Sequence, residues 1–122
     1  MIRTLPIALL LAAQPAPGPA PAPVALTPAQ FAQALQGVVG QRYEGGVTIA
    51  RIFAEGRTLV IVLDGPAGWR TAMNAAQVSE LFTGSFCEDS EFNYFVDGNT
   101  MRIDTTESGG ANRPGPIIRS CG

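Results

Sequence analysis

Histidine and lysine are both absent from this 122-residue chain, and charged residues of all kinds make up only 15% of it. Without histidine the chain lacks the usual base for a serine or cysteine nucleophile, and without lysine it lacks the Ser–Lys alternative. The eight basic residues, all arginine, are outnumbered by ten acidic residues, which gives a net charge of -2. This balance argues against nucleic acid as a partner, because nonspecific nucleic-acid binding needs a dense positive surface.

Metal and cofactor motifs are missing as well. Zinc sites in proteins take Cys or His ligands, and the only two cysteines, Cys87 and Cys121, are expected to be bonded to each other. The run Asp97–Asn99 superficially looks like part of a metal loop, but a tight hairpin turn explains it better. We therefore expect no metal, no cofactor and no catalytic residue, and we predict that the protein is not an enzyme.

The first thirteen residues have the pattern of an export signal. Met1–Arg3 carries one positive charge, Leu5–Ala13 is a short apolar run, and its last two residues are small enough for cleavage. The run is too short to span a bilayer, which needs about 20 residues. We expect a signal peptide over residues 1–13 and no transmembrane segment once it is cleaved.

The destination of the protein is predicted to be the periplasm or the extracellular space. Both cysteines lie far beyond the signal, and disulfides persist in such oxidising compartments. An arginine-only set of bases, with many Ala, Gly and Pro residues, is typical of a GC-rich bacterial genome.

Residues 14–25 are predicted to be a linker. Within them, Pro15–Pro23 alternates proline with small residues, a pattern that favours polyproline II and acts as a semi-rigid spacer. The remaining residues, 26–122, have the length of one small domain. The 46% apolar composition is enough for a single core.

Two segments carry matching signals for the start of a helix. Thr27 and Asn74 are favourable N-cap residues, and Gln30 and Gln77 follow three positions later, where a capping box requires them. Apolar residues at helical spacing follow: Phe31, Leu35 and Val38 in the first segment, and Val78, Leu81 and Phe82 in the second. Glycines are expected to end the helices: Gly37 or Gly40 for the first, and Gly84 for the second.

Each predicted helix is followed by two β-rich runs around an acid–Gly pair. Val47–Ala54 and Thr58–Asp64 flank the first pair, and Phe92–Val96 and Thr100–Thr106 flank the second. Because an acid–Gly turn between β-rich runs favours a hairpin, we predict two hairpins. The repeated helix–strand–strand order suggests an internal duplication.

The predicted fold is α+β, with a small antiparallel sheet, two helices and one disulfide. With a last strand at Pro116–Cys121, the element order is αββαβββ. Thr58–Leu63 is apolar on both faces and is therefore expected to be central in the sheet. A Cys87–Cys121 bond would stabilise the domain by roughly 4 kcal/mol in the chain-entropy model.

Seven residues are candidates for contact with a partner, because they are aromatic or charged and fall in loops or on sheet surfaces. They are Trp69, Arg70, Glu88, Asp89, Glu91, Tyr94 and Arg113. For Trp69 the alternative is a plug over the edge of the core. For the acidic residues it is a solvated loop, and for the glycine-rich Glu107–Gly115 loop around Arg113 it is a mobile connection.

These features together predict an exported domain that acts by binding a protein of the envelope or the extracellular space. It would be an envelope or secretion accessory factor, or an inhibitor. One alternative is a module that binds a small ligand between the helices and the sheet. A weaker one is a cell-wall hydrolase that uses Asp64, Asp104 or Glu107. The sequence leaves the partner and the oligomeric state open.

Overall fold

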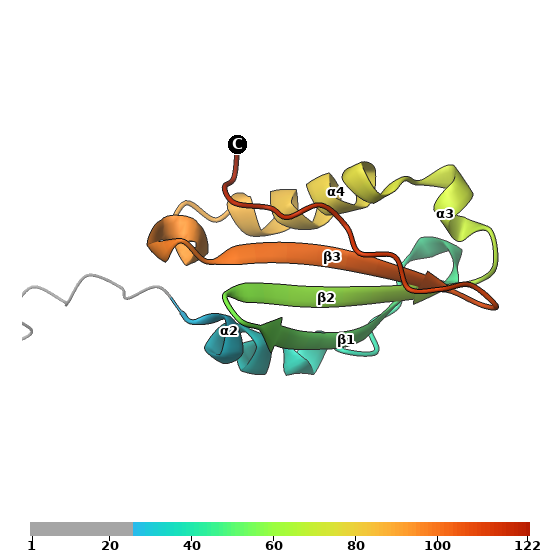
Figure 1. Ribbon diagram of the computed structural model, residues 1–122, viewed down its shortest axis with the longest axis horizontal. Coiled ribbons are helices and arrows are strands. Elements are labelled where there is room, and N and C mark those ends of the chain that lie inside the picture. Colours follow the sequence, from blue (N-terminus) through green and yellow to red (C-terminus); the bar gives the residue numbers. More distant parts are fainter. Residues whose placement is uncertain (1–25) are drawn as a thin grey trace, which may run out of the picture.

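The computed structural model describes residues 26–122. The predicted signal peptide (1–13) and linker (14–25) lie outside these residues and stay predictions. In chain order the elements are α2 (Pro28–Ala34), the 3₁₀ helices η1 (Gln36–Val38) and η2 (Glu44–Gly46), β1 (Thr48–Glu55), β2 (Thr58–Gly65), α3 (Trp69–Ala72), α4 (Ala75–Cys87), the 3₁₀ helix η3 (Tyr94–Asp97) and β3 (Thr100–Glu107). The predicted α+β class is confirmed (Figure 1).

The sheet has three strands in the order β1-β2-β3, with β2 in the centre as predicted. β1 and β2 form the predicted antiparallel hairpin, whereas β2 and β3 pair in parallel. In this register Ile61 of β2 lies between Ile52 of β1 and Ile103 of β3. A parallel pair needs a long crossover connection, and the segment containing α3 and α4 supplies it.

The prediction of a second hairpin was wrong. Phe92–Val96 does not enter the sheet, because Tyr94–Asp97 turns into a 3₁₀ helix that ends at Gly98, whose φ is +79°. The aromatic rings of this segment pack on one another and on Phe31 rather than alternating across a sheet. The second half of the chain therefore does not repeat the structure of the first, which removes the main support for an internal duplication.

The predicted last strand, Pro116–Cys121, is present only as an irregular segment beside β3. It touches the sheet through one isolated antiparallel bridge, Ile118 with Met101, and the loop before it adds a second, Arg113 with Thr105. Two prolines between those bridges remove backbone donors that a regular strand would need. The segment is tied down by the predicted disulfide, Cys87–Cys121, which joins it to the end of α4.

Both predicted capping boxes are present. The Thr27 hydroxyl accepts a hydrogen bond from the Gln30 backbone at 3.2 Å, and Asn74 Oδ1 accepts one from the Gln77 backbone at 2.9 Å. α2 ends earlier than predicted, and α4 runs past Gly84 to Cys87. Its last turn places Phe86 against the core, and this packing outweighs the poor helix propensity of glycine.

The core lies between one face of the sheet and the two longer helices. Buried apolar side chains from α2, α4 and all three strands form one cluster, which includes Phe31, Ile49, Ile52, Leu59, Ile61, Leu63, Val78, Met101 and Ile103. α2 packs on β1 and β2, and α4 packs on β3. None of the helices in residues 26–122 is long and apolar enough to cross a membrane.

Candidate functional site

An apolar groove of about 870 Å³ lies over β1 and β2, between residues 35–47 on one side and α3 and α4 on the other. We call it the groove. Its floor is formed by Ile49, Ile52, Ile61 and Leu63 of β1 and β2. One wall is formed by Leu35, Val38, Tyr43 and Val47, and the other by Trp69, Met73, Val78, Leu81, Phe82 and Phe86.

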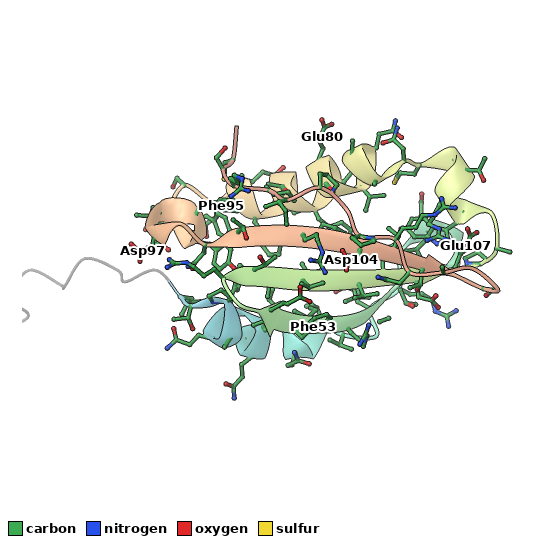
Figure 2. All side chains as sticks on the ribbon, viewed as in Figure 1. Phe53, Glu80, Phe95, Asp97, Asp104 and Glu107 are labelled. Atoms are coloured by element: carbon green, nitrogen blue, oxygen red, sulfur yellow. A yellow bond between two sulfur atoms is a disulfide. The ribbon has the colours of Figure 1, made fainter. Side chains whose placement is uncertain are left out.

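The lining of the groove is almost entirely apolar. Among the described residues that line it, Glu44 alone carries a charge. Two large side chains on the walls reach solvent: Tyr43 is 42% exposed and Leu81 is 58% exposed. On the same helix as Leu81, Glu80 points away from the sheet (Figure 2). Exposed apolar residues beside an apolar hollow are typical of a binding surface.

Trp69 closes one end of the groove and is held by its ring nitrogen. Its Nε1 donates a hydrogen bond to the Thr106 carbonyl at 2.8 Å. The indole ring lies directly over Gly65, where a Cβ atom would come within 2.6 Å of it. Trp69 therefore covers the edge of the core and also lines the groove, while its contact with a partner stays a prediction.

Arg70 is part of a polar cluster that fixes α3 to the end of β3. Its side chain is 6% exposed, and its Nε and Nη2 atoms donate to the Glu107 carboxylate at 3.0 and 2.8 Å. Its Nη1 donates to the Thr105 and Ala111 carbonyls. A hydrogen bond from the Gly68 backbone, and then the bonds from Arg70, hold the pKa of Glu107 below its usual value of 4.5.

Tyr94 is placed in the core. It is 2% exposed, its hydroxyl donates to the Thr100 carbonyl at 2.8 Å, and burial raises the pKa of Tyr94 to about 12. The acidic residues Glu88, Asp89 and Glu91 are exposed just beyond α4, and Asp89 accepts a hydrogen bond from the Glu91 backbone.

The seven predicted contact residues do not form one surface. Trp69, Arg70 and Arg113 belong to the end of the molecule where β3 finishes, marked by Glu107 in Figure 2. Tyr94 and the acidic residues belong to the opposite end, marked by Phe95 and Asp97. Of the seven, Trp69 alone lines the groove.

The wall residues Tyr43, Leu81 and Phe82 were not predicted as contact residues. Leu81 and Phe82 were assigned to the buried side of a helix because their spacing fits an apolar stripe. The sequence did hold a signal for an exposed apolar residue here. Leu81 and Phe82 are adjacent in a helix, so they cannot both face the sheet. No sequence signal pointed to Tyr43.

The three carboxylates of the hydrolase alternative are engaged elsewhere in the fold. Asp104 is buried and bound by Arg102 at 2.7 and 2.9 Å, Glu107 is bound by Arg70, and Asp64 accepts a hydrogen bond from Thr106 at 2.6 Å. None of the three lines the groove. Across residues 26–122, no group of three Cys, His, Asp or Glu side chains is arranged to hold a metal ion.

Both edges of the sheet are already partly occupied. Along β1, Ile49 exchanges backbone hydrogen bonds with Gly40 and Gln41, and the Gln36 side chain donates to the Ile52 carbonyl. Along β3, Met101 exchanges two backbone hydrogen bonds with Ile118. These contacts leave little free edge for a partner strand, which favours the groove as the binding surface.

Comparisons with known proteins identify the fold. No protein-family model and no curated protein sequence matches this chain. Among solved structures, the pilotin EpsS of the Vibrio vulnificus type 2 secretion system matches with a TM-score of 0.58 and 17% identity, over 75% of this chain and 83% of that one. The type II secretion system pilotin AspS from Vibrio cholerae matches with a TM-score of 0.55 and 18% identity, over 75% and 84%. At this identity the likeness shows that the chain shares its fold with these pilotins.

Proposed function

We propose that this protein is an exported accessory factor of a type II secretion system, and that it binds a protein of that system through the groove. The observation that carries the proposal is the apolar groove, with exposed wall residues, in a fold shared with two proteins named as type II secretion pilotins. The predicted signal peptide and the Cys87–Cys121 bond support a location outside the cytoplasm.

An amphipathic segment of the partner fits this site best. The groove offers an apolar floor and two apolar walls, so it can take up the apolar side chains of such a segment while the polar side stays in water. Leu81, which is 58% exposed on the α4 wall, is the large apolar side chain that would become buried on binding. Full burial of a leucine side chain is worth about 1.5–3 kcal/mol.

Leu81→Asp tests the proposal, with Val96→Asp as its matched control. Leu81 is 58% exposed on the groove, and Val96 is 76% exposed on η3, outside the groove. Because both side chains are exposed, both variants should stay folded. Leu81→Asp should weaken partner binding at least about tenfold, because it places a charge in an apolar interface, and Val96→Asp should not.

The measurement is capture by the full chain, expressed in its own host and recovered from the envelope, with mass spectrometry of what is bound. Recovery of a type II secretion component that is lost with Leu81→Asp and kept with Val96→Asp supports the proposal. The proposal is contradicted if both variants recover the same amount of the component. It is also contradicted if every recovered protein lies outside that system.

A small apolar ligand is the second candidate occupant. The volume of about 870 Å³ lies within the range of roughly 300–1,000 Å³ that is usual for small-molecule sites. Native mass spectrometry of the protein recovered from the envelope separates the two candidates. A bound species of constant low mass, released by Leu81→Asp, would favour the small-ligand module.

A further inference from the structure

One aromatic contact bridges the two walls of the groove. Tyr43 comes from the segment between η1 and β1, and Phe82 comes from α4. Their ring centroids are 5.7 Å apart with the planes at 75°, which is an edge-to-face contact. Tyr43 is 42% exposed, whereas Ile61 and Leu63 on the floor are only 1% exposed. The Tyr43–Phe82 pair therefore stands between solvent and part of the floor.

In residues 26–122, the contact with Phe82 is the one aromatic contact of the Tyr43 ring. Within residues 26–122 its hydroxyl takes part in no hydrogen bond, whereas the ring nitrogen of Trp69 and the hydroxyl of Tyr94 are both bonded to backbone carbonyls. A tyrosine with a free hydroxyl and an exposed ring loses little when it turns outward into water.

The backbone beneath Tyr43 is fixed while the positions beside it are open. The Tyr43 amide donates to the Val47 carbonyl at 2.7 Å, so the residue is anchored to the start of β1. Gly40 and Gly45 adopt φ values of +92° and +80°, and no atom lies within 4 Å of where their Cβ atoms would be. Because the backbone is anchored at Tyr43, a movement of its ring would come from rotation of the side chain.

We propose that Tyr43 is the gate of the groove: its ring packs on Phe82 when the groove is empty and turns outward when an apolar segment enters. This inference rests on the proposed function for the identity of the natural occupant. The gate itself is a property of the empty protein. When only a fraction of the molecules is in the open, binding-competent state, the apparent affinity is reduced by that fraction. Removal of the gate should therefore tighten binding.

The test uses the dye 1-anilinonaphthalene-8-sulfonate and the full chain recovered from the envelope. Trp69 is the single tryptophan of the chain and lines the groove, so its NMR signals report entry of the dye. Tyr43→Ala should bind the dye about fivefold more tightly than the unaltered protein, because the open state no longer has to compete with the closed one. Tyr43→Phe keeps the ring contact and should bind like the unaltered protein.

A second measurement needs no substitution. In the unaltered protein, nuclear Overhauser effects between the Tyr43 and Phe82 rings should be present without dye and lost at saturation, while the Trp69 signals shift. Persistence of those effects at saturation would overturn the gate, and so would equal dye affinity for Tyr43→Ala and the unaltered protein, or no shift of Trp69 in either. None of these results involves a secretion component, so a failed gate and a failed proposed function are told apart.

Discussion

Gly65 leaves room for the indole ring of Trp69, and this single position shapes one end of the groove. A Cβ atom there would lie 2.6 Å from the ring, well inside van der Waals contact. We expect Gly65→Ala to lower the free energy of unfolding by about 1–3 kcal/mol, because the ring must shift and strain its bond to Thr106. Urea unfolding followed by Trp69 fluorescence measures the change.

Gly84→Ala is the matched control for that substitution. Gly84 lies inside α4, and nothing is within 4 Å of where its Cβ would be. Alanine should therefore stabilise the protein by about 0.5–1 kcal/mol through helix propensity. Equal effects of the two alanines would contradict the account of Gly65.

Glu107 makes a prediction for pH. Its pKa is lower in the folded protein than in the unfolded chain, where it is near 4.5, because the Gly68 backbone and Arg70 bind the charged form. The stabilisation is therefore present above pH 4.5 and is lost as the pH falls through the lower folded-state pKa. Glu107→Gln should be less stable than the unaltered protein at neutral pH, and the gap should shrink in acid. Urea unfolding midpoints of both proteins, measured at neutral pH and in acid, test this. A stability difference that does not change with pH would refute it.

At the scale of elements, the disulfide holds the C-terminal segment against β3. Cys121 follows Ile118 by three residues, and Ile118 is bonded to Met101. Replacing both cysteines with serine should cost about 2–4 kcal/mol of stability and release this segment. Hydrogen exchange should then speed up at the amides of Met101 and Thr105, which donate to the segment, and change less in the β1–β2 hairpin. Unchanged protection at both amides would show that the disulfide does not hold the segment in place.

The elements also show which parts of the fold are readable from local sequence. The capping boxes at Thr27 and Asn74, the first hairpin and the disulfide were all predictable, because each depends on residues close in sequence or on a unique pair. The parallel pairing of β3 with β2 was not predictable, because the local sequence of a strand is the same whether it pairs in parallel or in a hairpin. The Asp97–Gly98 pair closes a 3₁₀ turn as readily as a β-turn.

The candidate site was harder to predict than the fold for the same reason. Sequence reasoning chose aromatic and charged residues in loops, and two of those it chose, Arg70 and Tyr94, are tied into the structure by hydrogen bonds. The groove lies over β1 and β2, where residues 35–47 face α3 and α4. That arrangement depends on helix length and on contacts between residues distant in sequence, so no single sequence motif predicts it.

On the scale of the whole molecule, the protein is a three-stranded sheet flanked by α2 and α4 (Figure 1). An apolar groove lies over β1 and β2. The Arg70 cluster binds the end of β3 through the Thr105 carbonyl, and Arg102 pairs with Asp104 within β3. Two of the six large apolar side chains that are exposed in residues 26–122, Tyr43 and Leu81, stand on the walls of the groove. The proposed binding role rests on this apolar lining, and the fold is one that two secretion pilotins share.

The measurement that tests this account most directly is the dissociation constant of the captured secretion component for three proteins: unaltered, Leu81→Asp and Val96→Asp. The account predicts that Leu81→Asp weakens binding at least about tenfold while Val96→Asp binds like the unaltered protein. Equal binding by all three proteins would contradict it, because the partner would then be held outside the groove.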